Sequence, residues 1–485
     1  MNVVCWQDAR KIVALVVGRL LPGLLLMSAL LTPSAMAQDE ISLADLGQSV
    51  SVEAAFIDAD GGAGDQFTRE LAKRLADVEK KLKSRDDADK KTADAAAKKF
   101  TVRPFGRIHI DAVSFNQSGA NRAVVGDARN GVDIRRARLG VEGEGFDTFF
   151  YRFDVDFVTF DQSSQKRPTI FDAYIDTQNL PVLKNVRVGH FREPFSLERL
   201  DSTHDLPFLE RSAAVNMLAP FRNIGVMPFG WNEAETVTWA YGVFAENTNE
   251  FGEQVSDRTG LAFTTRVTAL PWYDEHAEGR GLWHIGASYS YRNLSNPLRQ
   301  FAQVPEVQGK EDALALSRTP NWVNTGPLSI NDYHVLGLET TAVLGSLSLQ
   351  GEYIGLFANQ TNGDQACLHG GYLEALYFLT GENRNYNRKQ GIYGAVTPHS
   401  NFFRVKTDSG IETGSGAWEV AARVSNVDLI SRNVHGGDML NMTLGLNWYY
   451  AVRSRVMFNY VHSFLDRGGV DSTADMFATR FQFAF

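Results

Sequence analysis

The chain has 485 residues, of which 44% are hydrophobic and 11% aromatic, with 42 Gly and a formal net charge of −9. The acidic balance gives no support to nucleic-acid binding, which needs a basic surface, and the slightly negative mean hydropathy excludes a bundle of membrane helices. The aromatic content argues against a mostly disordered chain.

Residues 1–37 have the pattern of a secretory signal peptide. Arg10 and Lys11 supply the positive start, an apolar stretch covers 20–31, and small residues at 35–37 fit a cleavage site. The alternative is an uncleaved N-terminal membrane anchor. The pattern therefore predicts an exported protein. Of its two cysteines, the mature chain would keep only Cys367, which excludes a disulfide framework.

Two short segments follow the leader. Residues 38–66 are polar and Gly-rich, which predicts a linker, and residues 67–99 are charged with a helical stripe of apolar residues. That stripe consists of Leu71, Leu75, Val78 and Leu82. We expect a short amphipathic or coiled-coil helix, because the stripe is too short for a long coiled coil. A solvated helix and a self-association element remain open alternatives.

From residue 100 onward, apolar and polar residues alternate with period two. In the segment 105–113, Arg107, His109 and Asp111 share one face, while Ile108 and its alternate neighbours share the other. The same alternation recurs to the last residues of the chain, 481–485. This period predicts β-strands with one wet and one apolar face. A soluble antiparallel sandwich shows the same pattern, so the choice between the two folds depends on further features.

Three features favour an all-β fold in the form of a transmembrane antiparallel β-barrel. The strands are about 9–11 residues long, which suits a tilted bilayer crossing. The apolar faces carry Tyr, Trp and Phe near strand ends, as interfacial girdles do. The wet faces carry charges of both signs in mid-strand, which a packed core would not tolerate unpaired. We predict a barrel of about 16 strands over residues 100–485.

The connections support the same fold. Short turns, expected on the periplasmic side, are 145–148, 179–185, 344–346 and 451–454, and long external loops are 196–222 and 293–332. The segment 381–416 is long where a short turn is expected. It is expected either to fold back into the lumen or to contain further strand residues. Phe485 at the C-terminus resembles the assembly signal of outer-membrane proteins.

Several runs resemble the phosphate-selective porin family (porins O and P). They include Val132 to Gly145, Val188 to Glu198, Arg222 to Met227 and Gly416 to Arg423. The resemblance covers about residues 100–485. It implies a 16-stranded trimeric outer-membrane porin for small ions, in contact with outer-membrane lipid, whose third external loop folds inward. It implies no cofactor, no metal and no nucleic-acid partner.

The family also implies that arginines from the early strands form a basic path for phosphate. The predicted pore-lining residues are Arg107, Arg136, Arg138, Arg152, Arg187, Arg192 and Arg222. The predicted constriction-loop residues are Glu198, Arg199, Asp201, His204, Asp205, Glu210 and Arg211. Arginine suits oxyanions because its planar fork stays charged and donates two hydrogen bonds.

One alternative is that these arginines pair with aspartates on neighbouring strands and leave no net field. The aspartates in question are Asp111, Asp154, Asp156, Asp172 and Asp176. The predicted constriction-loop residues include four carboxylates and two arginines, so phosphate selectivity stays open. Two rival functions are an outer-membrane enzyme, for which His109, His190 and His204 are the early histidines available, and a structural barrel tethered through its N-terminal helix.

Overall fold

The computed structural model describes residues 100–158, 168–246, 260–277, 279–308, 319–407 and 410–485, together with Lys80 and Lys83. Apart from Lys80 and Lys83, both helical, the predictions of a signal peptide, a linker and a short helix over 1–99 therefore lie outside the described residues. The compact unit that contains the barrel begins at Ala97. Within the described ranges, no helix is both long and apolar enough to cross a membrane.

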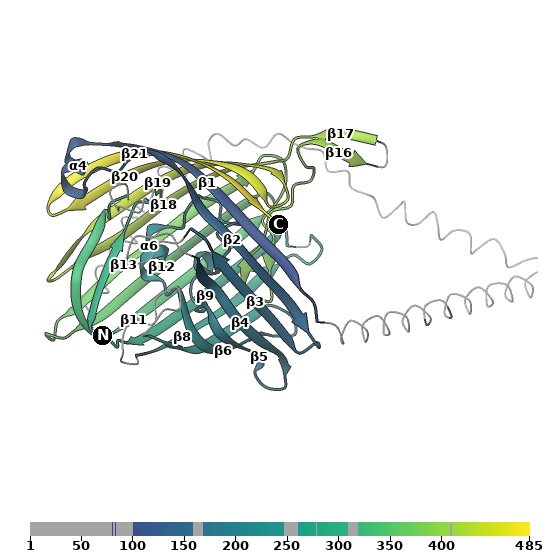
Figure 1. Cartoon of the computed structure of the whole chain (residues 1–485), viewed down its shortest axis with the longest axis horizontal. Coiled ribbons are helices and arrows are strands. Elements are labelled where there is room, and N and C mark those ends of the chain that lie inside the picture. Colours follow the sequence, from purple (N-terminus) through teal and green to yellow (C-terminus); the bar gives the residue numbers. More distant parts are fainter. Residues whose placement is uncertain are drawn as a thin grey trace, which may run out of the picture. The chain divides into compact units, whose positions relative to one another are not determined.

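Sixteen antiparallel strands close into a barrel, as predicted, because the first strand pairs with both the second and the last (Figure 1). The strands are β1 (Arg103–Gln117), β2 (Gly131–Gly145), β3 (Phe149–Asp156), β4 (Thr169–Leu180), β5 (Lys184–Arg192), β6 (Arg222–Trp231), β7 (Val237–Ala245), β8 (Leu261–Tyr273), β9 (Gly281–Asn293), β11 (Val323–Leu344), β12 (Leu347–Gln360), β13 (Gln365–Phe378), β18 (Ala417–Ser431), β19 (Val434–Ala451), β20 (Ser454–Arg467) and β21 (Val470–Ala484). Closure leaves no open sheet edge, which a bilayer would not tolerate.

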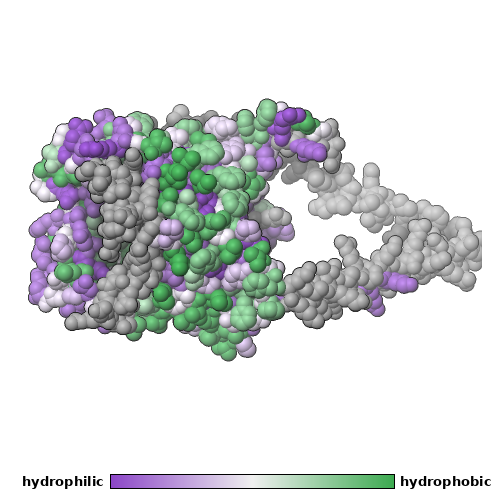
Figure 2. Space-filling view, in the orientation of Figure 1, coloured by the Kyte–Doolittle hydropathy of each residue, from purple (hydrophilic) through white to green (hydrophobic). Residues whose placement is uncertain are grey.

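The alternation of the sequence sets the two faces of the wall. Along β1, Arg107, His109 and Asp111 are buried inside the barrel, whereas Ile108 and Ile110 are 45% and 39% exposed on its outside. Hydrophobic residues gather in a band over the visible wall, with hydrophilic residues beyond it at the end that carries α4 (Gly119–Val125) (Figure 2). The wall therefore has the apolar exterior that lipid contact requires.

The predicted short turns are confirmed. At the first of them, β2 ends at Gly145 and β3 begins at Phe149, and Phe146 and Asp147 both have positive φ angles of 57° and 53°. Two successive residues with positive φ give the turn the twist that joins adjacent strands tightly. Apart from the segment 381–416, the long insertions therefore lie in the loops at the opposite end of the barrel.

The strands themselves are longer than predicted in several places. β11 has 22 residues and begins inside the stretch 293–332 that was expected to be a loop. The same stretch contains β10 (Leu298–Gln303), which pairs with the start of β11. The expectation of a single long loop there is wrong, because backbone pairing continues past the length needed to cross a bilayer.

The unusual segment 381–416 fulfils both expectations made for it. It contains two small hairpins, β14–β15 (Tyr386–Asn387 and Ile392–Tyr393) and β16–β17 (Phe403–Thr407 and Gly410–Gly414). Tyr393 is 2% exposed and contacts the external loop and the inner wall, so the part around β14–β15 lies inside the lumen. We call residues 379–402 the periplasmic insert.

Candidate functional site: the constricted lumen

The loop between β5 and β6 folds into the inside of the barrel, as predicted. It carries two short helices, α5 (Leu197–Leu200) and α6 (Ala213–Leu218). The hydroxyl groups of Ser196 and Ser212 accept hydrogen bonds from backbone N–H groups three residues later and so cap both helices. The apolar side of α6 packs into a cluster that includes Ile354 and Leu368 of the wall. We call residues 196–221 the constriction loop.

Arginines of the last strands hold the constriction loop in place. Arg480 of β21 donates to the carbonyl oxygen of Leu209 and pairs with Glu210 at 3.0 Å. Arg455 of β20 donates to the carbonyl oxygens of His204, at 2.8 Å, and Leu206, at 2.5 Å. Neither arginine is among the predicted pore-lining residues, although the alternation of the sequence places both on the wet face of their strands.

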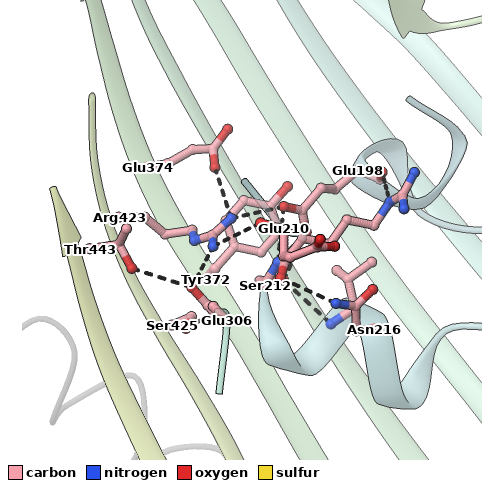
Figure 3. Close-up of polar contacts among 12 residues, drawn as sticks. Glu198, Glu210, Ser212, Asn216, Glu306, Tyr372, Glu374, Arg423, Ser425 and Thr443 are labelled. Carbon is pink, nitrogen blue, oxygen red and sulfur yellow. Dashed lines mark hydrogen bonds and ion pairs between the residues drawn. The ribbon is translucent and has the colours of Figure 1, made fainter. Parts of the chain in front are cut away.

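Arg423 of β18 joins three segments that are far apart in the chain (Figure 3). Its guanidinium pairs with Glu198 of the constriction loop at 3.1 Å, and with Glu306, which follows β10. The Glu306 carboxylate also accepts from the backbone N–H of Ala213, at 2.9 Å, and from Ser425. Glu374 of β13 lies 4.0 Å from the same guanidinium. One cation thus ties two external segments to the wall.

Most of the predicted pore-lining arginines have carboxylate partners. Arg136 pairs with Glu210 (2.7 Å), Arg138 with Asp156 (2.7 Å), Arg152 with Glu142 (2.8 Å) and Asp154 (3.7 Å), Arg187 with Asp176 (2.7 Å), and Arg222 with Asp172 (2.9 Å). The fifth predicted aspartate, Asp111, pairs instead with Arg480 at 2.6 Å. The pairing alternative therefore describes these five arginines, although Glu142 and Glu210 were not foreseen as partners.

Arg107 and Arg192 differ from the other five. Arg107 donates to the hydroxyl groups of Ser202 (3.0 Å) and Thr203 (3.4 Å), and Arg192 donates to the carbonyl oxygens of Leu200 (2.5 Å) and Asp201 (3.1 Å). Neither has a carboxylate partner among the residues that the structure describes. Both guanidiniums lie where the early wall meets the constriction loop.

The seven predicted loop residues lie in the lumen, but their hydrogen bonds and ion pairs are mainly with other loop residues and with the wall. Arg199 donates to the carbonyl oxygens of Val215 and Asn216, and Arg211 donates to those of Glu198 and Asp201. These arginines therefore fold the loop. Asp205 is half-buried beside His204.

The periplasmic insert meets the constriction loop at Asp201. The Asp201 carboxylate accepts from the backbone N–H of Tyr393 at 2.8 Å and lies 3.5 Å from Arg384. The insert also reaches the wall, where Arg266 donates to the carbonyl oxygen of Gly391 at 2.8 Å. The lumen is thus narrowed from both ends.

Burial and neighbouring charges shift the pKa values of several loop groups. Burial raises the pKa of Asp201 to about 7, although Arg384 opposes that shift. Burial also lowers the pKa of His204 to about 3, and the charge of Arg455 lowers it further. Burial disfavours the Glu210 carboxylate, but the nearby guanidinium of Arg136 holds its pKa well below the usual range. At neutral pH, His204 is therefore uncharged and Glu210 is ionised.

Of the three early histidines, His109 and His204 lie near each other, without a third catalytic partner being established by the described contacts. The rings of His109 and His204 lie 5.8 Å apart, and His204 Nε2 is 2.9 Å from the carbonyl oxygen of Arg453. His190 is buried in β5. Over the part of the chain that the structure describes, no group of three or more His, Cys, Asp or Glu side chains is placed to hold a metal ion.

A closed antiparallel barrel with an apolar exterior and an inward-folded loop is the architecture of a porin. The chain belongs to the family described as phosphate-selective porin O and P, whose model matches residues 102–485. It is an outer-membrane protein. Porin O of Pseudomonas aeruginosa is 26% identical over 423 residues, which cover 80% of this chain and 89% of that protein.

Further similarities are more distant. An uncharacterized protein of Caulobacter vibrioides is 26% identical over 368 residues, covering 73% of this chain and 67% of that protein. Among solved structures, an anion-selective porin from Comamonas acidovorans is 13% identical, with 79% of this chain and 100% of that chain covered and a TM-score of 0.46. A trimer form of OmpT from Vibrio cholerae is 10% identical, with 80% and 99% covered and a TM-score of 0.46.

Proposed function

We propose that the protein forms a passive channel for small anions, including phosphate, and assembles as a homotrimer. The observation that carries the proposal is that the guanidinium groups of Arg107, Arg136 and Arg192, from the early strands, contact the constriction loop. The description of the family and the name of the relative Porin O support it. The family indicates a channel, and we propose no enzymatic activity.

Within this channel we assign direct contact with the anion to Arg107 and Arg192. Among the described residues, neither guanidinium forms an ion pair with a carboxylate, so the charge of each is less compensated than that of the five paired arginines. The Ser202 and Thr203 hydroxyl groups beside Arg107 would add hydrogen-bond donors for an oxyanion once they turn toward it. The arginines paired with aspartate or glutamate contribute less field and hold the wall.

The N-terminal region has its own proposed roles. We propose that residues 1–37 direct export and are removed, that 38–66 link the barrel to a helix, and that 67–99 assist association of the subunits. These roles require no contribution to the pore.

Reversal potentials in a KCl gradient test the anion proposal. Replacing Arg107 and Arg192 together with Gln should shift the selectivity toward cations and weaken the inhibition of chloride current by phosphate. Arg122→Gln on α4 is the control, because it removes the same charge from a side chain that is 56% exposed outside the lumen. Unchanged selectivity in the double variant would refute the assignment of these two residues.

A further inference from the structure

The inner wall near the periplasmic turns carries aromatic rings on its lumen side. These are the rings of Phe105, Phe150, Tyr174, Phe229 and Trp231, and all are half-buried. Their neighbours along the strands face the opposite way, as Phe153 and Ile175 show by being 42% and 52% exposed on the outer wall. Porin lumens are normally polar, so rings that border the lumen need an explanation.

Cationic groups lie between these rings. The guanidinium carbon of Arg152 is 4.1 Å from the centre of the Phe105 ring, and that of Arg187 is 3.9 Å from Tyr174. Arg187 is also 5.2 Å from Phe229. At the periplasmic end, the ammonium groups of Lys184 and Lys389 lie 5.9 and 5.6 Å from Trp231. We call the five rings with Arg152, Arg187 and Lys184 the aromatic–cation strip.

The strip extends across adjacent strands of the wall. Arg152 of β3 is directly opposite Tyr174 of β4, and Tyr174 is opposite Gly189 of β5. Glycine positions leave room for the rings: a Cβ atom at Gly140 would lie 2.4 Å from the Phe105 ring, and one at Gly189 would lie 3.0 Å from Tyr174 Cβ. The absence of a side chain at these two glycines thus makes room for the rings.

The guanidinium groups of the strip are more exposed to the lumen than those of Arg138 and Arg222. The side chains of Arg187 and Arg152 are 20% and 22% exposed, whereas those of Arg138 and Arg222 are 4% and 1% exposed. Arg187 binds Asp176 through Nε and one terminal nitrogen, at 2.7 and 2.8 Å. Its other terminal nitrogen has no hydrogen-bond acceptor among the described residues.

Partial pairing makes this strip a weak site for a bare inorganic anion. Asp176 and Glu142 offset much of the charge of Arg187 and Arg152. A ligand that also contacts the rings gains apolar burial and stacking in addition to the charge interaction. The combination of partly exposed rings with partly exposed cations therefore favours solutes that have both an apolar part and a negative group.

We propose that the aromatic–cation strip binds small amphipathic organic anions, of the aryl carboxylate type, on their way through the lumen. The carboxylate would contact Arg187 or Arg152, and the ring would lie against Tyr174 and Phe229. The proposal rests on the proposed anion channel and names a class of permeant solute for it.

The test compares benzoate with acetate, which has the same charge but no ring. In planar bilayers, the full-length protein should pass benzoate better than acetate relative to chloride, despite its larger size. Tyr174→Ser with Phe229→Ser should lower the benzoate-to-acetate permeability ratio about two- to tenfold, while chloride conductance persists. Tyr241→Ser, on the outer wall where Tyr241 is 39% exposed, is the matched control and should leave the ratio unchanged.

A second variant and a second measurement separate the two proposals. Trp231→Ser changes the rim of the strip and should also lower the benzoate-to-acetate permeability ratio. It replaces the double variant in the test if the double variant does not assemble. Benzoate binding to the detergent-purified protein, followed by saturation-transfer NMR, does not depend on conduction. A conducting wild type without preference for benzoate, or a preference that survives both variants, overturns the strip. Benzoate bound at Tyr174 in a protein without conductance supports the strip and refutes the channel.

Discussion

Replacing Arg423 with Met tests whether one buried cation holds the constriction loop. The Arg423 side chain is 1% exposed and those of its partners Glu198 and Glu306 are 2% and 1% exposed. Methionine fills most of the volume but removes the positive charge. Glu198 then keeps hydrogen bonds from Ser212, at 2.8 and 3.1 Å, but loses its ion pair. Figure 3 shows how closely these side chains converge on Arg423.

The energy follows from the burial of the two carboxylates. Removing one partner of a buried ion pair costs about 3–5 kcal/mol, because an uncompensated charge stays behind. If that cost falls on the docked state of the loop, the ratio of docked to released loop decreases about 100- to 4,000-fold, at about 1.4 kcal/mol per factor of ten. Arg480 and Arg455 still hold the other part of the loop, so we expect release around α6 rather than loss of the barrel.

Single-channel conductance in planar bilayers measures this change. Arg423→Met should increase the conductance and the current noise, and Arg423→Met with Glu306→Gln should reverse part of the effect. Arg432→Met, at an exposed turn after β18, is the control for the same replacement. A variant with wild-type conductance and noise would show that Arg423 does not hold the loop.

Two more predictions concern single positions. Burial raises the pKa of Asp201 to about 7 from an ordinary value of 3.8, so the stability that its protonated carboxyl contributes is lost as the pH rises from about 4 to 7. Asp201→Asn should therefore flatten the pH dependence of thermal unfolding over that window. An unchanged pH profile would contradict the reasoning. Gly140→Ala would place a Cβ atom 2.4 Å from the Phe105 ring and 2.5 Å from a backbone oxygen of β3, so it should destabilise the barrel by about 1–3 kcal/mol. The control Gly119→Ala should not destabilise it, because no atom lies within 4 Å of the added Cβ. Equal melting temperatures of the two variants would refute this prediction.

The periodicity of the sequence determined most of the fold. A strict period of two puts each side chain on one of two faces, so Arg107 and Ile108 could be assigned to the lumen and the membrane before any pairing was known. Positions of short turns followed for the same reason, because strands must end where the alternation stops. The length of β11 did not follow, since pairing with β10 depends on a neighbour that the local pattern does not specify.

The partners of each charge were decided only by the tertiary structure. Alternation shows that Arg136 faces the lumen, but its carboxylate partner Glu210 is 74 residues away and comes from a loop folded across the barrel. The same holds for Arg423 and Arg480, whose contacts depend on how the strands close around that loop. The local sequence encodes which face of the strand each side chain occupies. Burial and charge pairing inside the lumen depend instead on distances across the closed barrel, and these distances are set only when the last strand pairs with the first.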